Sequence, residues 1–150
     1  MKSQDLNIIL DITRRAWGRY TLYQLLEDRH GSIWQNSASE RKVDEVRSFC
    51  QSHADRVIVA EINRKVVGYA MYSISESDGI GEVRNNAVDP DYQGKGVGTA
   101  MNKWIIDHFR KLKLKIARVS TLEHDKPAQR VYEKQGFKEL ARTIHYSMEL

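Results

Sequence analysis

Three closely spaced glycines lie between an expected strand and an amphipathic helix. Gly94, Gly96 and Gly98 stand within the segment Gln-Gly-Lys-Gly-Val-Gly that begins at Gln93. Because glycine has no Cβ, the backbone N–H groups of such a loop can converge on one ligand. The N-terminus of the following helix adds partial positive charge, so the segment predicts a cradle for an anion such as a pyrophosphate. A flexible loop without a ligand is the alternative for this segment taken alone.

Two common phosphate-binding motifs fit this segment poorly. A Walker A loop needs a glycine separated by four residues from a Gly-Lys-Ser/Thr sequence, and that pattern is not met here. A dinucleotide fingerprint needs glycine or alanine where Thr99 stands, a parallel βαβ unit and an acidic residue about 20 residues further on. The strand before this loop instead belongs to an expected antiparallel meander.

The spacing of apolar residues over the rest of the chain predicts the helices and strands that would position this loop. Apolar residues at helical spacing predict helices through the first 54 residues or so, with Ser39 as the N-cap of the last of them. The alternation and β-branched runs further on predict strands over 56–61, 66–74, 81–88 and 116–121. Helices are expected over 98–112 and 125–135, and Gly136 should end the second. Phe137 and residues 143–148 are expected to supply closing strands in a final hairpin.

Two separated motifs resemble those of the GNAT acetyltransferase superfamily. The glycine loop is similar to that family's Arg/Gln-x-x-Gly-x-Gly/Ala motif. The segment 125–137, Asp-Lys-Pro-Ala-Gln-Arg-Val-Tyr-Glu-Lys-Gln-Gly-Phe, resembles its second signature, Asn-x-x-Ala-x-x-x-Tyr-x-x-x-Gly-Phe. The strand sequence over 85–90 also resembles the family's strand before the loop. The resemblance covers roughly residues 56–137, with the motifs in the expected order.

This resemblance implies a single α/β N-acetyltransferase domain over residues 1–150 with a GNAT-like fold. Its central twisted sheet would be mostly antiparallel and flanked by helices, with one parallel strand pair splayed apart. The pantetheine arm of acetyl-CoA, the expected cosubstrate, would lie in that gap between the strands 81–88 and 116–121. Such edge pairing depends on backbone groups rather than on side chains.

The resemblance also assigns a set of cofactor contacts. Asn86 and Val88 would offer backbone groups to the arm, and the loop amides would hold the pyrophosphate. The cofactor-binding residues predicted in this way are Asn86, Ala87, Val88, Gln93, Gly94, Lys95, Gly96, Val97, Gly98, Thr99, Asp125 and Ala128. Asp125 departs from the family's asparagine and cannot donate a hydrogen bond when ionised, so capping of the helix that follows is the favoured role for this residue.

Two catalytic residues follow from the same resemblance. Tyr132 stands seven residues after Asp125, where similar enzymes carry a tyrosine that protonates the departing thiolate. A phenol with a pKa of about 10 remains protonated at neutral pH and can donate. Glu82 precedes Ala87 by five residues, where lysine-acetylating relatives carry a glutamate, and it could take the amine's proton directly or through water. The alternative for Tyr132 is packing against the cofactor without a chemical role. The alternative for Glu82 is a solvent-exposed position on the strand. Ser120, at the position where some peptide-acetylating relatives have their base, is a poor base.

The acceptor is expected to be a primary amine of a small molecule or a protein, attacking directly in a ternary complex. Aromatic side chains in the N-terminal helices could line its site, although aromatic residues in helices also build cores. These residues are Trp17, Tyr20, Tyr23 and Trp34. Acidic residues of the same helices could attract a cation or could form a solvated face. These residues are Glu27, Asp28, Glu40, Asp44 and Glu45.

Composition narrows the remaining classes. The 150 residues carry a net charge of +4, with one cysteine, Cys50, and five histidines without ligand spacing, so we expect no disulfide and no metal. No apolar stretch resembles a signal peptide or a membrane span, which predicts a cytoplasmic protein without a membrane partner. A basic cluster within 110–118 could bind nucleic acid, but the sequence lacks aromatic nucleic-acid signatures and this reading ranks last. A non-catalytic acyl-CoA sensor is the main alternative, and the C-terminal strands could support a homodimer.

Overall fold

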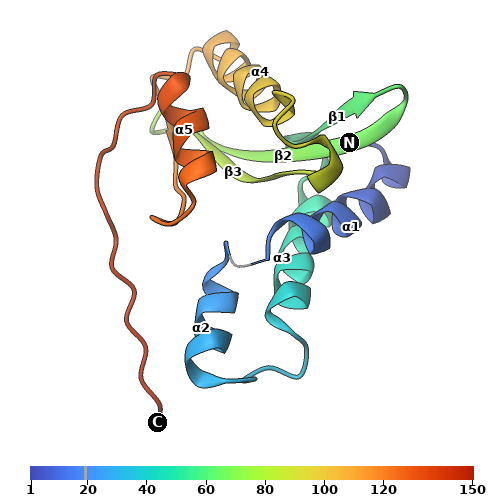
Figure 1. Ribbon diagram of the computed structural model, residues 1–150. Coiled ribbons are helices and arrows are strands. Elements are labelled where there is room, and N and C mark those ends of the chain that lie inside the picture. The colour runs from blue at the N-terminus through green and yellow to red at the C-terminus, as the bar shows by residue number, and fades with distance from the viewer. Residues whose placement is uncertain (19) are drawn as a thin grey trace.

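The computed structural model describes residues 1–18 and 20–150 and contains one four-stranded sheet with helices on both faces (Figure 1). The strands run in the order β1-β2-β3-β4, with β1, β2 and β3 antiparallel and β4 parallel to β3. The strand bounds are β1 Val57–Ile62, β2 Lys65–Ser75, β3 Ile80–Val88 and β4 Ile116–Val119. The predicted α/β architecture with one parallel strand pair is therefore confirmed.

Three helices precede the sheet: α1 Leu6–Ala16, α2 Leu22–His30 and α3 Ala38–Ser52. Side-chain oxygens cap the second and third, because the first N–H groups of a helix have no partner within it. Thr21 accepts from the backbone of Gln24 at 3.0 Å, and Ser37 accepts from that of Glu40 at 3.3 Å. The cap of α3 is thus Ser37 and not the predicted Ser39, which lies inside the helix.

Two further helices flank β4 in the chain, α4 Val97–Lys111 and α5 Lys126–Lys134. Their positions agree with the predicted helices to within one residue at each end. Gly136 follows α5 with φ +92°, a left-handed conformation that glycine adopts at little cost. Tyr132 of α5 contacts Asn86 in the C-terminal part of β3, and α4 lies on the face of the sheet opposite α1 and α3 (Figure 1).

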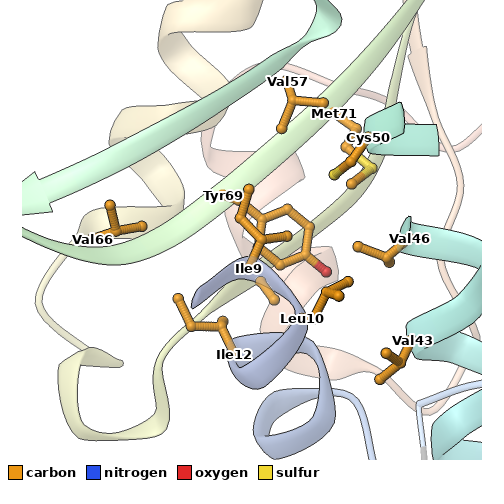
Figure 2. Close-up of a cluster of buried hydrophobic side chains, with 11 residues drawn as sticks. Ile9, Leu10, Ile12, Val43, Val46, Cys50, Val57, Val66, Tyr69 and Met71 are labelled. Atoms are coloured by element: carbon orange, nitrogen blue, oxygen red, sulfur yellow. The ribbon is translucent and has the colours of Figure 1, made fainter. Parts of the chain in front are cut away.

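One hydrophobic core lies between the sheet and the helices α1 and α3 (Figure 2). The Tyr69 side chain is fully buried at its centre. Its hydroxyl group forms a hydrogen bond with Thr13 at 2.8 Å and accepts one from Trp17 Nε1 at 3.1 Å. These bonds satisfy a phenol that would otherwise be costly to bury. They also fix α1 against β2.

The second core lies on the opposite face, beneath α4. It joins Val67 and Val83 of the sheet to Met101, Ile105 and Phe109 of the helix. The Phe109 ring packs so closely on β3 that a Cβ built on Gly81 would lie 2.6 Å from ring carbons. A glycine is therefore required at position 81 for α4 to pack at this distance.

The expected closing strands are wrong for this structure. In the part of the chain that the structure describes, residues 138–150 form neither helix nor strand, and they extend away from α5 (Figure 1). A strand forms only when its backbone finds a partner, and the period-two pattern of a segment does not specify which partner that is. Here the segment leaves the sheet instead of pairing with it.

Candidate active site

The glycine loop joins β3 to α4 with an open arrangement of backbone. Gly94 and Gly96 have φ +74° and +81°, and a Cβ built on either would meet no atom within 4 Å. Gly96 is the N-cap of α4 and has no side chain with which to satisfy the first N–H groups of the helix. These groups and the positive end of the helix dipole face the loop, as an anion-binding helix terminus requires.

Side chains around the loop hold it in place. The buried Asp89 carboxylate accepts from the backbone N–H of Asp91 at 3.0 Å and pairs with Arg15 of α1 at 3.1 Å. Gln93 donates to the Val88 carbonyl oxygen at 3.2 Å, and Lys95 donates to the Asp91 carbonyl oxygen at 3.1 Å. The two predicted phosphate-contacting side chains, those of Gln93 and Lys95, are therefore bonded within the loop.

The strand β3 loses its parallel neighbour just before the loop. Pairing of β3 with β4 ends at Val83 and Val119, so the stretch from Arg84 to Val88 has no strand beside it on that side among the described residues. The β2–β3 ladder is also irregular where Arg84 and Asn85 lie. The backbone of Asn86, Ala87 and Val88, the predicted cofactor contacts, lies along this open part of the edge.

Tyr132 of α5 reaches this part of β3. Its side chain is buried, and its hydroxyl oxygen accepts a hydrogen bond from Asn86 Nδ2 at 3.3 Å. Burial raises the Tyr132 pKa above its ordinary value, although the Asn86 bond opposes this shift. The phenol therefore stays protonated at neutral pH, and its proton is available to a second group because the oxygen is the acceptor in the bond to Asn86.

Asp125 is the N-cap of α5, as predicted. Its carboxylate accepts from the backbone N–H of Ala128 at 3.2 Å and from the Thr121 hydroxyl group at 3.2 Å. Aspartate is a preferred N-cap residue, and its negative charge also suits the positive end of the helix. Ala128, the other predicted contact in this segment, lies in the first turn, one helical turn before Tyr132.

Glu82, the predicted base, lies in the paired part of β3. Its carboxylate accepts from Arg118 Nη2 at 2.9 Å and Nε at 3.3 Å, across the parallel strand pair. Four residues of extended chain separate it from Asn86, which corresponds to roughly 13 Å along the strand. The structure therefore brings Asn86 and Tyr132 together but does not bring Glu82 beside them.

Sequence reasoning missed a partly buried polar cluster that joins α3 to β3. Lys42 Nζ donates to Glu45 at 3.0 Å and to Asn85 Oδ1 at 2.8 Å, and Asn85 Nδ2 donates to Glu45 at 2.8 Å. The Lys42 ammonium group also lies 4.2 Å from the ring centre of Trp17. A signal existed, because Lys42 stands four residues before the buried Val46 on the apolar stripe of the helix.

The charges in this cluster depend on one another. Burial lowers the Lys42 pKa, and the Glu45 carboxylate opposes that shift. Burial alone would raise the Glu45 pKa, but hydrogen bonds from Asn85 and Lys42 hold it below its ordinary value. A cleft of about 260 Å³ opens beside them, with Glu45 and Asn85 in its wall. The cluster fixes the side chain of Asn85, the residue before Asn86 in β3, on the face of the sheet that carries α1 and α3.

The aromatic residues predicted to line the acceptor site either pack on other aromatic residues of the first half of the chain or contact the loop before α5. Trp17 is bonded to the core tyrosine, and Tyr23 packs edge-to-face on Trp34 at 5.8 Å between ring centres. Tyr20 stacks on His124 at 5.7 Å, which brings the segment between α1 and α2 against the loop before α5. The N-terminal helices therefore meet the Tyr132 helix region at this point.

The predicted acidic residues are mostly engaged with neighbours rather than free to attract a cation. Glu27 accepts from the backbone of Ala38, Asp28 from Gln24, and Glu40 from Arg14. Asp44 pairs with Arg47 one turn further on. Within the described chain, 1–18 and 20–150, no cluster of three histidine, cysteine, aspartate or glutamate side chains could hold a metal ion. No helix in these ranges is both long and apolar enough to cross a membrane.

The residues present fit an anionic cofactor with an extended arm. The loop offers backbone N–H groups where a Cβ would find open space, and β3 offers an unpaired edge that leads toward Tyr132. A pyrophosphate needs the first feature, and an arm that pairs as an added strand needs the second. The site therefore suits coenzyme A in both respects.

Comparison with known proteins agrees with this fit. The model of the acetyltransferase (GNAT) family matches residues 19–137. An uncharacterized N-acetyltransferase of Methanocaldococcus jannaschii is 30% identical over 90 residues, which are 57% of this chain and 40% of that protein. A mycothiol acetyltransferase of Streptomyces avermitilis is 27% identical over 115 residues, 77% of this chain and 37% of that protein. The chain thus spans well under half the length of these two relatives.

Solved structures share the fold at lower sequence identity. The ribosomal-protein-S18-alanine N-acetyltransferase of Escherichia coli superposes with a TM-score of 0.66 at 22% identity, covering 94% of this chain and 76% of that one. The PaiA N-acetyltransferase of Thermoplasma acidophilum, in complex with coenzyme A, has a TM-score of 0.68 at 16% identity, covering 92% and 86%. With its α/β GNAT fold, its glycine loop and a family match over most of its length, this chain belongs to the GNAT family of N-acetyltransferases.

Proposed function

We propose that this chain transfers the acetyl group of acetyl-CoA to a primary amine of a small molecule or a protein, by direct attack in a ternary complex. The observation that carries the proposal is the contact between Tyr132 and Asn86. It lies where β3 loses its parallel neighbour and just before the loop that can hold a pyrophosphate. A proton donor, an open strand edge and an anion site therefore follow one another along one path.

The GNAT family uses acetyl-CoA, and the residues that would hold it here lie in two groups. The backbone N–H groups from Gln93 to Thr99 would bind the pyrophosphate, with the first turn of α4 behind them. The open edge of β3 over Asn86, Ala87 and Val88 would pair with the arm. When bound, acetyl-CoA supplies a thioester carbonyl carbon for the amine to attack and a thiolate that departs.

Tyr132 is the proposed proton donor to that thiolate. Its raised pKa keeps the phenol protonated across the physiological range. Asn86 holds the hydroxyl oxygen from one side, which orients the O–H bond toward a different acceptor. After the thiolate takes the proton, the phenolate regains one from solvent, and the charge balance of the site is restored.

Glu82 is the proposed acceptor of the proton that the amine must lose, because an ammonium group has no lone pair. It stands roughly 13 Å along β3 from Asn86, so the proton would travel through water rather than directly. The guanidinium group of Arg118 would have to release the Glu82 carboxylate, or share it, during this step. The rest of the rate enhancement would come from holding amine and thioester together.

We further propose that residues 1–150 form one domain. The two hydrophobic cores lie on opposite faces of a single sheet, so neither can form without the other. We specify the acceptor only as a primary amine. The relatives carry names as different as mycothiol acetyltransferase and N-acetylaspartate synthetase, so they do not indicate one substrate. A cytoplasmic location also stays a prediction from the sequence.

One observation favours a second candidate function, a non-catalytic sensor that binds acyl-CoA. The Glu82 carboxylate is held by Arg118, so the chain could bind the cofactor without a free base. The two functions differ in turnover and not in affinity for acetyl-CoA. A measurement of both quantities on the same protein therefore separates them.

The experiment combines calorimetry with acetyl-CoA and a thiol-release assay against a panel of amines. The panel contains a polyamine, an aminoglycoside, free amino acids and peptides with a lysine or a free N-terminus. Amine-dependent thiol release supports the enzyme, and Glu82→Gln should then lower kcat while Glu76→Gln, in the exposed turn before β3, leaves it unchanged. Tight binding without release for every amine supports the sensor, and absence of binding contradicts both.

A further inference from the structure

The cleft beside the polar cluster of α3 and β3 is small and carries both apolar and polar side chains. Its volume of about 260 Å³ lies below the range of about 300–1,000 Å³ that is typical of pockets for drug-sized ligands. Besides the cluster, its wall contains two rings, two hydroxyl groups and a guanidinium group, those of Phe49, His53, Ser48, Ser52 and Arg84. The two rings stack at 5.0 Å between their centres. The cleft therefore suits a small molecule that has an apolar part and a polar part.

An irregularity in β3 turns Arg84 into this cleft. Arg84 and Asn85 stand opposite a single residue of β2, Met71, where the ladder shifts its register. An extra residue in one strand changes the direction of its side chains, and here two consecutive ones line the same cleft. Asn86 follows directly, and its Nδ2 donates to the Arg84 carbonyl oxygen at 3.2 Å and to the Tyr132 hydroxyl oxygen at 3.3 Å. The cleft therefore ends beside the proposed proton donor.

The Arg84 guanidinium group has no carboxylate of its own. Its one ion pair within the described chain is with Glu82 at 3.9 Å, and Arg118 binds that carboxylate more closely, at 2.9 Å. The other carboxylate of the cleft, that of Glu45, is bonded to Lys42 at 3.0 Å. Three cations thus stand against two carboxylates. Because the Arg84 side chain is 44% exposed, this excess charge is accessible to a ligand.

We infer that the acetyl acceptor is a free amino acid with an apolar side chain, and that Arg84 binds its carboxylate. The planar fork of guanidinium N–H groups matches the two oxygens of a carboxylate. Arg84 Cζ lies 5.9 Å from the centre of the Phe49 ring, so the apolar side chain of the same ligand can pack on that ring. Its amine would then point along β3 toward Asn86, two residues or roughly 7 Å further on.

This inference rests on the proposed function and narrows its acceptor. The amine nitrogen forms a bond to the acetyl carbon as the carbon–sulfur bond of the thioester breaks, and the products are an N-acetyl amino acid and coenzyme A. The ammonium group loses two protons in all. Glu82 receives one through water and passes it to solvent, and the other is released to solvent. Tyr132 regains from solvent the proton that it gave to the thiolate.

The first measurement is of binding without transfer. Coenzyme A, which carries no acetyl group, is present while calorimetry compares L-phenylalanine with 2-phenylethylamine and L-leucine with 3-methylbutylamine. Each pair differs only in the carboxylate. We expect the amino acid to bind about tenfold to a hundredfold more tightly, as for one hydrogen-bonded charge pair. Arg84→Gln should abolish this preference. Arg110→Gln should keep it, because Arg110 also pairs with one carboxylate, that of Asp107, but lies on α4 across the sheet.

The second measurement is of thiol release from acetyl-CoA with the same two pairs. The ratio of kcat/KM for the amino acid to that for its decarboxylated partner should fall at least tenfold in Arg84→Gln and stay unchanged in Arg110→Gln. Since Arg84 also lies near Glu82, its loss could alter the rate for every amine. Such an effect cancels in the ratio.

The two measurements distinguish this inference from the proposed function. Equal binding of the two members of each pair to the unchanged chain overturns the inference, whatever the turnover. Turnover with a ratio that Arg84→Gln does not change also overturns it and leaves acetyl transfer to amines intact. Binding that depends on Arg84, without turnover of any of the four amines, contradicts the assignment of the cleft as the acceptor site.

Discussion

Tyr132 on α5 accepts a hydrogen bond from Asn86 on β3 at 3.3 Å, across 46 residues of sequence. The bond ties the helix of the second motif to the strand that leads into the glycine loop. It also occupies the oxygen of a buried phenol while leaving the phenolic proton free. The chemistry that we propose for this chain depends on this arrangement, in which a donor stands beside an open strand edge.

Replacing the phenol should remove the proton donor without removing the cofactor site. Tyr132→Phe keeps the ring and its packing on Phe137 but loses the hydroxyl group. We expect kcat to fall by roughly 10²–10⁴-fold, as for a lost general acid, with the dissociation constant of acetyl-CoA unchanged by calorimetry. Tyr146→Phe, in the exposed tail, is the matched control. A kcat for Tyr132→Phe within threefold of the unchanged chain would exclude the assigned role.

The backbone of the glycine loop should matter more to the ligand than to the fold. Gly96→Ala forces a residue with a Cβ into φ +81°, which costs about 1–2 kcal/mol. Gly31→Ala imposes at least as much strain at φ +77° and ψ −168°, a region that essentially only glycine adopts, at the C-terminal end of α2 and again with open space around the Cβ. Both variants should therefore lose stability in urea titrations, and Gly31→Ala should lose at least as much as Gly96→Ala. Acetyl-CoA affinity should fall only in Gly96→Ala, and equal affinities in the two variants would argue against the loop as the pyrophosphate site.

The close approach of α4 to the sheet predicts a steric cost at Gly81. A Cβ at this position would lie 2.6 Å from the Phe109 ring, so Gly81→Ala should destabilise the fold by roughly 1–3 kcal/mol through overpacking. The penalty should shrink when Phe109→Leu removes the ring, which a double-mutant cycle measured by urea unfolding will detect. Equal penalties in the two backgrounds would show that the ring is not the obstacle.

The buried thiol of Cys50 predicts a loss of stability at alkaline pH. Burial raises its pKa from 9.0 to about 11, so the thiol ionises at a lower pH in the unfolded chain than in the folded one. The stability that the neutral, buried thiol contributes to the fold is therefore lost as pH rises from 9 to 11. At about 1.36 kcal/mol per pKa unit, the stability difference between the unchanged chain and Cys50→Ala should narrow by about 1–2 kcal/mol between pH 8 and 10.5. A difference that stays constant over this range would contradict the shift.

The sequence predicts those elements whose boundaries are determined by residues within the element itself. Helices α4 and α5 were predicted to within one residue at each end, because caps, glycines and apolar spacing all lie within each segment. The N-cap of α3 was misplaced by two residues, since Ser37 and Ser39 both suit that role and only the geometry distinguishes them.

Contacts between distant segments could not be predicted in the same way. The bond from Arg118 to Glu82 depends on the register of β4 on β3, and the cluster of Lys42 with Asn85 depends on how α3 docks on the sheet. Neither arrangement leaves a local trace that specifies a partner. The tail shows the same limit, because its alternating residues predict a strand but not the edge to which it would bind.

The most direct test of the acetyl-CoA site, on which the proposed function depends, is thermal unfolding with and without acetyl-CoA, with NAD and ATP as controls. At about 100 times its dissociation constant, a ligand that binds only the native chain adds roughly 2.7 kcal/mol of stability. For a domain of this size, the midpoint should rise by roughly 5–10 °C. We expect this rise with acetyl-CoA and not with NAD or ATP. An unchanged midpoint at saturating acetyl-CoA, with no heat of binding by calorimetry, would contradict the assignment of the glycine loop and the β3 edge as an acetyl-CoA site.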